Sequence, residues 1–295
     1  MEIKHLRTFV TAAKLGSFVE TSKQLDYAPS TITSQIQLLE EELKVKLFER
    51  LGKQISLTYA GQTLLVYAER LIDLSEEAFT AVSGEAPRGT ITLGIAESLA
   101  IIRLSKVFGV YHQMLPDIDF DFKFGPCSEF KNYIRKNIID AAIMYDQETA
   151  EQDLIIEASY PESMVLVCAP QHPLAQKQEI YPSDLINETL IISESGCSYR
   201  DLLEGMMTGE KARFRSIISV SSLQAEKQFA ANGFGVCLLV KAAVKKDLDE
   251  RSLVELPWKG PEFHISTQII YHKDKWVSPA LRVFLDLIDQ ELKIK

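Results

Sequence analysis

The stretch "LDYAPSTITSQIQLLEEEL" (residues 25–43) predicts a turn followed by an amphipathic helix with two contrasting sides. The residues that recur at helical spacing and form one apolar stripe are Ile32, Ile36, Leu39 and Leu43. The opposite side carries short uncharged polar side chains, where a surface helix usually carries Lys and Glu: Ser30, Thr33, Ser34 and Gln37. This uncharged outer side needs an explanation.

The residues before this helix predict two further helices, the second of which would pair with it. Leu6, Phe9 and Val10 lie at helical spacing within residues 3–14, and Gly16 is expected to end that helix. Ser17 and Glu20 have the spacing of a capping box and predict a second helix through Leu25. Two short helices joined by a tight turn form the helix-turn-helix pattern. The second helix of this pattern enters the major groove of DNA, where it needs short hydrogen-bonding side chains on its outer side. A solvated face rich in Ser and Thr is the alternative.

The segment "FERLGKQISLT" (48–58) predicts a small hairpin that turns near Gly52. Arg50 and Lys53 lie beside its tip, where they are placed to contact phosphates next to a recognition helix. Residues 1–60 hold eight basic and seven acidic residues, although the whole chain has a net charge of −9. The acidity therefore lies downstream, and the N-terminal unit can still approach DNA.

Three stretches, "HLRTFVTAAKLGSFVETSKQL", "TITSQIQLLEEEL" and "KLFERLGKQISLTYAGQTLL", resemble the DNA-binding half of LysR-type transcriptional regulators. The resemblance implies an α/β multidomain chain with a winged helix-turn-helix (1–58), a linker helix and hinge (59–88), and a two-lobed α/β effector domain like periplasmic binding proteins (89–295). It also implies double-stranded promoter DNA and a small-molecule effector as partners, and leaves RNA polymerase open as another. The expected DNA contacts are Tyr27, Pro29, Ser30, Thr31, Thr33, Ser34, Gln37, Arg50 and Lys53.

The sequence departs from the family pattern at three places. Ala28-Pro29 replaces the usual Ser-Gln before the recognition helix, so the usual cap and a base contact are lost. An Ala at the cap position costs about 1 kcal/mol of helix stability. Lys44 stands where the family usually has Gly, and a left-handed conformation there would strain a Lys. Thr21-Ser22 replaces the usual Ala pair.

A long helix is expected to follow the hairpin, with Thr58 as its N-cap and an end near Ser83. Its apolar residues alternate spacings of three and four, which is a heptad pattern. Burial on the helix's own domain and dimerisation both explain that pattern. Dimerisation is favoured because a linker-like segment (83–89) follows, and it would present two DNA half-sites related by a dyad, in a homodimer or homotetramer. The predicted dimer contacts are Leu64, Tyr67, Leu71, Leu74 and Ala78.

From residue 90 onward, strand-like and helix-like segments alternate, which indicates parallel βαβ units. The first lobe is expected over 89–161 and 266–295, and the second over 162–265. Ligands in such sheets lie at the carboxyl ends of strands, against helix N-termini. Serines at these junctions are either helix caps or ligand contacts, and the two roles are compatible. The resemblance places these residues beside the ligand: Glu97, Ser98, Leu99, Ala100, Gly125, Cys127, Ser128, Ser195, Gly196, Cys197, Ser198 and Phe234.

Hydroxyls and helix N-termini favour a small anion or carboxylate as the effector, and Arg200 is a candidate partner for it. Glu97 argues for an amine or a neutral polar group instead. No cofactor is expected beside this effector.

The four cysteines are scattered and form no metal motif, so packing is their simplest role. A redox-responsive regulator using Cys127 and Cys197 is the alternative.

No GxSxG, GxGxxG or Walker motif occurs, and the five histidines are dispersed, so neither a catalytic nor a metal site is predicted. An α/β enzyme with a fused DNA-binding domain is a weaker alternative, and a stand-alone solute-binding protein leaves residues 1–60 unexplained. No secretion signal or membrane-spanning stretch is evident, so a cytoplasmic location is expected.

Overall fold

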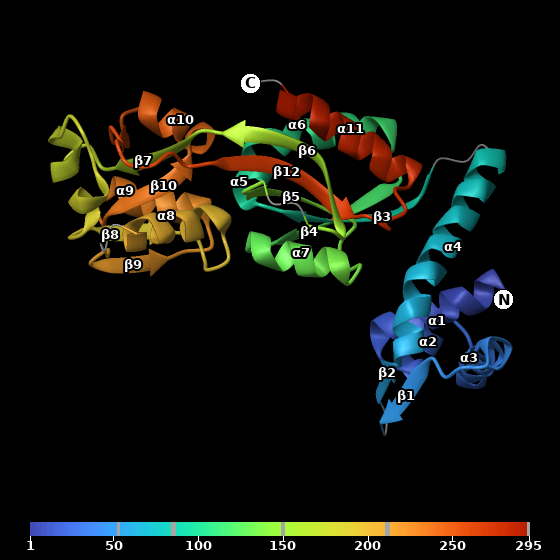
Figure 1. The fold of residues 1–295 in the computed structure, drawn as a ribbon. Coiled ribbons are helices and arrows are strands. Elements are labelled where there is room, and N and C mark those ends of the chain that lie inside the picture. The colour runs from blue at the N-terminus through green and yellow to red at the C-terminus, as the bar shows by residue number, and fades with distance from the viewer. Residues whose placement is uncertain (52–53, 84–86, 149–150, 210–212, 294–295) are drawn as a thin grey trace. The chain divides into compact units, whose positions relative to one another are not determined.

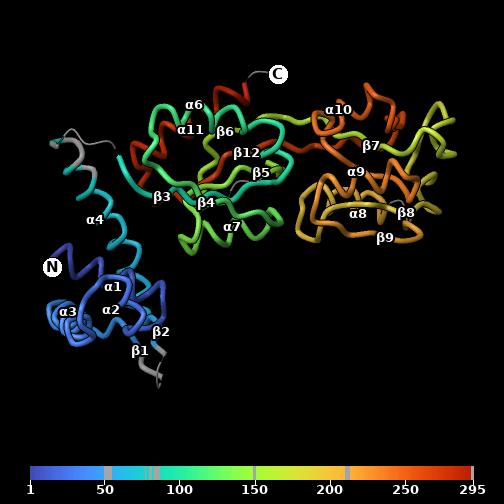
Figure 2. The backbone as a smooth tube through the Cα atoms, turned by 180° about the vertical axis from the view of Figure 1, so that it is seen from behind, coloured from blue at the N-terminus to red at the C-terminus, as the bar shows by residue number. Residues whose placement is uncertain are grey.

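The computed structural model describes residues 1–51, 54–83, 87–148, 151–209 and 213–293. It divides into two compact units, Met1–Pro87 and Arg88–Lys295, each traced in Figures 1 and 2. The first unit combines helices with one small hairpin, and the second contains two five-stranded sheets. The predicted α/β multidomain architecture is confirmed.

The first unit packs its helices around one apolar core that includes Phe9, Leu39 and Phe48. Gly16 ends the first helix in a left-handed conformation (φ +61°), and the Ser17 hydroxyl accepts a hydrogen bond from the Glu20 N–H at 3.4 Å, as predicted. The elements of this unit are α1 (Ile3–Leu15), α2 (Phe18–Gln24), α3 (Pro29–Leu43), β1 (Phe48–Leu51), β2 (Gln54–Leu57) and α4 (Tyr59–Ser83).

Helix α4 has two different apolar surfaces. Thr58 caps it as expected, because its hydroxyl accepts from the Gly61 N–H at 3.0 Å. Ala68 is fully buried, and Leu64 and Leu71 pack against the core of the same unit. Burial on the helix's own domain, the alternative to dimerisation, therefore accounts for the apolar residues of its first half. The apolar side chains that stay exposed on it include Tyr67, Leu74, Phe79 and Val82.

The first lobe of the second unit is a mixed sheet in the order β4-β3-β5-β12-β6. Strands β3, β4 and β5 are parallel, whereas β12 runs antiparallel to β5 and β6. Helices α6 and α11 cover one face and α7 the other (Figures 1 and 2). Its elements are β3 (Gly89–Ile95), α5 (Glu97–Leu99), the π-helical turn η1 (Ala100–Leu104), α6 (Ser105–Met114), β4 (Ile118–Phe124), α7 (Cys127–Arg135), β5 (Ala141–Asp146), β6 (Leu154–Glu162), β12 (Ile265–His272) and α11 (Pro279–Lys293).

The second lobe is a sheet in the order β11-β7-β10-β8-β9, in which β10, β8 and β9 are parallel. Side chains of its strands alternate between a core that includes Leu203 of α8 and a core that includes Ala230 of α9 and Val244 of α10. Its elements are β7 (Met164–Cys168), η2 (Pro173–Gln176), η3 (Pro182–Leu185), β8 (Thr189–Ile192), α8 (Ser198–Gly209), β9 (Ser216–Ser219), α9 (Leu223–Ala231), β10 (Val236–Val240), α10 (Lys241–Asp249) and β11 (Val254–Glu255).

Two features of the second unit differ from the sequence prediction. The stretch "SLAIIRLSKVFGVYHQMLP" (98–116) predicts a single helix, but the structure interrupts it with η1. Strand β6 was not predicted, because Pro161 and the polar residues beside it weaken the strand pattern. Pro161 is tolerated because β6 lies at the edge of its sheet.

Candidate DNA-binding surface and ligand cavity

Helix α3 presents its uncharged polar side to solvent. Ile32, Ile36 and Leu39 are fully buried on the other side. Leu43 is partly buried and packs against the same core. The predicted DNA contacts that are exposed or half-exposed at this surface are Tyr27, Pro29, Ser30, Thr31, Thr33, Ser34 and Gln37. In the described part of this unit, the polar surface is thus free to meet another molecule.

The ends of α3 bear out two expectations about its unusual residues. Ala28 occupies the N-cap position and provides no side-chain hydrogen bond, while Pro29 takes the first helical turn, where its missing N–H costs nothing. Lys44 adopts the left-handed conformation at φ +56°. Buried Thr21 and Ser22 satisfy their hydroxyls by donating to the backbone carbonyls of Ser17 and Val19.

The wing and the acidic run give a more mixed result. The hairpin β1–β2 forms as predicted. Lys53 and the Arg50 side chain lie outside the described part of the structure, so their DNA contacts stay predictions. The run Glu40-Glu41-Glu42 at the end of α3 predicts a part of the helix that leaves the groove, but its first residue, Glu40, does not face solvent. It is buried and accepts hydrogen bonds from the Leu47 N–H at 2.9 Å and the Lys46 ammonium at 2.6 Å.

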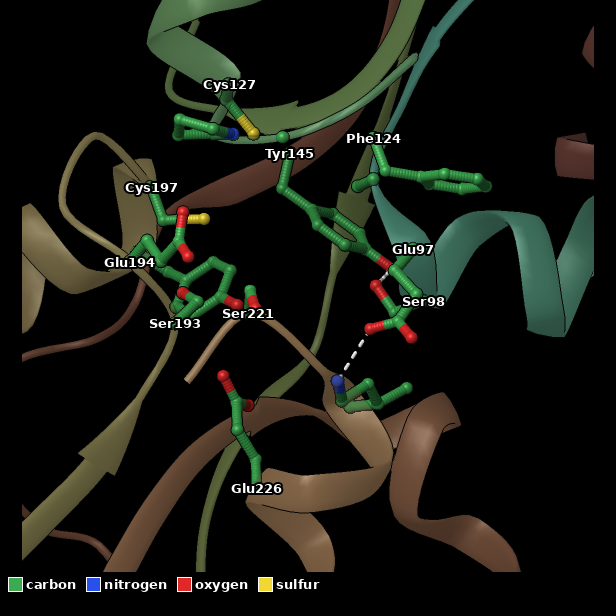
Figure 3. Close-up of a pocket in the computed structure, with 15 residues that line it drawn as sticks. Glu97, Ser98, Phe124, Cys127, Tyr145, Ser193, Glu194, Cys197, Ser221 and Glu226 are labelled. Atoms are coloured by element: carbon green, nitrogen blue, oxygen red, sulfur yellow. Dashed lines mark hydrogen bonds between the residues drawn. The ribbon is translucent and has the colours of Figure 1, made fainter. Parts of the chain in front are cut away.

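A cavity of about 430 Å³ lies between the two lobes of the second unit. Its walls come from the carboxyl ends of parallel strands in both lobes, as expected for an α/β sheet protein. The volume suits a small organic ligand. Its lining residues are Ala96, Glu97, Ser98, Phe124, Gly125, Pro126, Cys127 and Tyr145 from the first lobe, and Ser193, Glu194, Cys197, Tyr199, Ser221, Leu223 and Glu226 from the second (Figure 3).

Five residues that the resemblance placed beside the ligand line this cavity: Glu97, Ser98, Gly125, Cys127 and Cys197. Leu99 is instead buried in the first-lobe core, and Ala100 packs against that core. Phe234 is 59% exposed and contacts Phe229. The remaining predicted residues outside the described lining are Ser128, Ser195, Gly196 and Ser198.

Three of these residues hold the lobes together beside the cavity. The Ser128 N–H donates to the Gly196 carbonyl at 3.1 Å, across the lobes. Gly196 has φ +93°, and a Cβ there would lie 2.3 Å from the Ser128 hydroxyl oxygen, so only Gly fits this approach. The Ser198 hydroxyl donates to Asp146 Oδ1 at 2.6 Å. Ser128 and Ser198 are predicted to face a ligand, but in the structure they make contacts between the lobes and lie outside the described lining of the cavity.

Glu97 also joins the lobes. Its Oε2 accepts a hydrogen bond at 2.6 Å from the N–H of Leu223, the first residue of α9 (Figure 3). The preceding Ser222 occupies the N-cap position of α9 but makes no side-chain cap, although a serine at a strand-to-helix junction is expected either to cap the helix or to contact a ligand. A carboxylate from the other lobe therefore satisfies the N-terminus of α9, where the helix dipole favours negative charge.

The cavity wall is acidic. Glu97, Glu194 and Glu226 line it, and its described lining contains no Lys, Arg or His. Arg200, the candidate partner for an anion, is engaged elsewhere. It pairs with Glu204 at 2.8 Å and donates to the Ser193 carbonyl. The charge of this wall favours the amine or neutral alternative over the anion that the serines suggested.

Cys127 and Cys197 meet at the cavity, one from each lobe, and both sulfur atoms are directed into it (Figure 3). A hydrogen bond from the Cys127 thiol lowers the pKa of Cys197 to about 6, with help from the Ser193 and Tyr199 hydroxyls. The same hydrogen bond, together with burial, raises the pKa of Cys127 well above its usual value. The lowered pKa of Cys197 could not be predicted from the sequence, because none of the groups that lower it is a cationic neighbour.

Sequence reasoning missed most of the second-lobe wall. Glu226 is 2% exposed and lies within α9, where a Glu would normally be taken as a solvated helix residue. Tyr145 and Tyr199 occupy apolar positions of a strand and a helix that sequence patterns assign to the core. Within that wall, the resemblance pointed to Cys197, and Ser221 lies at a strand-to-helix junction where a hydroxyl is expected.

Two further observations bear on the class of site. No group of three or more His, Cys, Asp or Glu residues among the described positions is arranged to hold a metal ion. No helix in the described ranges is long and apolar enough to cross a bilayer.

Comparisons with known proteins agree with this geometry. Residues 3–62 match the family model described as bacterial regulatory helix-turn-helix protein, lysR family. Residues 84–293 match the LysR substrate binding domain. The HTH-type transcriptional regulator YwqM of Bacillus subtilis is 36% identical over 99% of this chain and 100% of its own length. The regulator GltR of the same organism is 29% identical over 100% of this chain and 98% of its own.

Solved structures share the fold at low sequence identity. A full-length OxyR variant from Pseudomonas aeruginosa has a TM-score of 0.72 at 19% identity, covering 100% of this chain and 95% of its own. Full-length LysG from Corynebacterium glutamicum with bound effector Arg has a TM-score of 0.71 at 16% identity, covering 99% of this chain and 98% of its own.

Proposed function

Because the chain belongs to the LysR-type family of bacterial transcriptional regulators and is not an enzyme, we propose that a small molecule bound between its two lobes controls how it holds promoter DNA in the cytoplasm. The cavity that both lobes line carries this proposal. A ligand there contacts both lobes at once, so its binding energy depends on how they are set against each other.

On the DNA side, the polar surface of α3 enters the major groove and the wing contacts phosphates. Two chains pair through the exposed apolar side of α4, which includes Leu74 and Phe79. Pairing sets the spacing of the two recognition helices, so the operator is two half-sites related by a dyad. A ligand that shifts the lobes re-spaces these helices and changes the DNA bend.

The test is a thermal-shift screen of a small-metabolite library against the full chain, with Ser98→Trp as the matched variant. A ligand that binds only the folded state raises its melting temperature by mass action. We expect at least one compound to stabilise the wild type and not the variant. If every compound that stabilises the wild type stabilises the variant equally, ligand control through this cavity is rejected.

Redox control is a second candidate, supported by the contact of Cys127 and Cys197 across the lobes. The Cys197 thiolate attacks a hydroperoxide, giving a sulfenic acid and releasing the alcohol or water. The Cys127 thiol then attacks that sulfur, and its proton leaves with the hydroxyl group as water. The product is a disulfide that ties the first lobe to the second.

Two measurements test this second candidate. Reaction of Cys197 with iodoacetamide should be half-maximal near pH 6, the pKa of its thiol. Non-reducing mass spectrometry after hydroperoxide treatment should show loss of two hydrogens in the wild type and not in Cys127→Ser. An unchanged wild-type mass rejects the redox switch and leaves ligand control standing.

A further inference from the structure

The cavity holds one carboxyl group that the fold buries without a partner. Glu226 is 2% exposed, lines the cavity, and extends from α9 toward the space between the lobes (Figure 3). Within the described chain no hydrogen bond or ion pair reaches this carboxyl group. Its neighbour Lys227 turns away, with its ammonium paired to Asp247 at 2.5 Å.

Such a group is costly to keep, because burial disfavours its charged form. Burial, followed by the negative charges of Cys197 and Glu97, raises the pKa of Glu226 to about 8. The other titratable groups around it are Tyr199 of α8 and Cys237 of β10, neither of them cationic. The charge of Arg103 acts on Tyr145 instead. Nothing described around Glu226 offers the positive charge that its ionised form would need.

The geometry points to a ligand that supplies this charge: we propose that the cavity binds a small molecule through a protonated amine held against the Glu226 carboxylate, with Glu194 of the same lobe and Glu97 of the other lobe also lining the cavity. The inference rests on the proposed function and names its ligand class. Glu97 is already held by the Leu223 N–H and Glu194 is exposed to solvent, so Glu226 is the buried carboxyl left for the ligand.

An anionic ligand would show the opposite dependence of binding on pH. A neutral Glu226 could donate its proton to the carboxylate of an anionic ligand. An amine binds the ionised form, so binding releases a proton and strengthens as pH rises toward 8. An anion binds the protonated form, so its binding weakens over the same range. The direction of the pH dependence therefore separates the two classes.

The probes are methylammonium and 1,4-diaminobutane, compared with acetamide and acetate at equal ionic strength, on the full chain. An alkyl ammonium stays charged from pH 6.5 to 8.5, as a Lys side chain does. We expect both amines to raise the melting temperature, with affinity at least about tenfold higher at pH 8.5 than at pH 6.5. Acetamide and acetate should have no such effect.

Glu226→Gln is the critical variant. It should fold, because Gln copies the neutral acid present at pH 7, and it should lose the amine response and its pH dependence. Glu250→Gln, at an exposed position of the second lobe outside the cavity, is the matched control and should keep the amine response and its pH dependence. Stabilisation by acetate, an equal amine response in Glu226→Gln, or no amine response at any pH would each overturn the cation assignment. None of these results affects ligand control itself, because the library screen presumes no charge.

Discussion

The carboxylate of Glu97 in the first lobe accepts a hydrogen bond from the backbone N–H of Leu223 in the second, at 2.6 Å. This contact caps α9 from across the cavity, where Ser222 of the same lobe does not. The helix N-terminus that would attract an anionic ligand is thus already occupied by the protein's own carboxylate.

Glu97→Gln should weaken this contact between the lobes. The amide oxygen still accepts a hydrogen bond, but the negative charge at the N-terminus of α9 is lost. We expect the second unit to lose about 0.5–1 kcal/mol of unfolding free energy at low salt, and less at high salt. Urea denaturation at two ionic strengths measures this. A loss that does not depend on salt would show that charge is not the cause.

Thr33→Glu should reduce DNA binding by about 10–100-fold, because a carboxylate facing base edges and phosphates is repelled and desolvated. Fluorescence anisotropy on a fragment selected by the wild type from a random-sequence pool measures the change. Thr63→Glu on α4 is a close control, since both threonine hydroxyls donate to the carbonyl four residues earlier. Equal binding by the two variants would mean that the groove side of α3 is misassigned.

Ser98→Trp should fill part of the cavity and remove the ligand response while preserving DNA binding. Ser98 lines the cavity and donates to the Tyr145 hydroxyl at 3.2 Å. Melting-temperature shifts and DNA anisotropy on the same sample separate the two effects. Ser105→Trp, at an exposed position of α6, is the control. A retained ligand response in Ser98→Trp would place the ligand elsewhere.

Leu74→Asp should weaken dimerisation by at least about tenfold, because it places a charge in an apolar interface. Leu74 is 52% exposed within its own chain, so the fold of the single chain should survive. Sedimentation equilibrium gives the dissociation constant. Val19→Asp, 56% exposed on α2, is the control for surface charge. An unchanged constant for Leu74→Asp would rule out this side of α4 as the dimer contact.

Glu226 should make the chain lose stability as pH rises. Its pKa is raised on folding, so the folded state holds the proton more tightly than the unfolded state. That stabilisation is complete below the unfolded pKa and is lost as pH rises through about 8, at up to about 1.4 kcal/mol per pH unit. Unfolding free energies of wild type and Glu226→Gln between pH 5 and 8.5 measure the difference. Parallel pH profiles would contradict the buried, unpaired state of Glu226.

Local chemistry explains what the sequence could predict. Helix ends at Gly16 and Ser17, the polar side of α3 and the hydroxyl at Ser98 follow from residue type and spacing. The positions of the cavity residues at strand ends follow from the alternation of strands and helices.

The rest depends on contacts between distant segments, which one sequence does not display. Glu40 is buried because the backbone of Leu47 and Phe48 offers it N–H groups, and a run of three Glu gives no hint of that. The lowered pKa of Cys197 depends on Cys127 of the other lobe, and the raised pKa of Glu226 depends mainly on its burial in the folded chain. The expectation of an anionic ligand rested on the serines at strand-to-helix junctions, whereas three glutamates line the cavity of the folded chain.

The most direct test of ligand-controlled DNA binding is a footprint and bend-angle measurement on one promoter fragment, with and without a saturating ligand from the library screen. We predict that the ligand changes the protected region or the bend in the wild type and leaves both unchanged in Ser98→Trp. An identical wild-type footprint and bend at saturation would contradict the coupling between cavity and DNA.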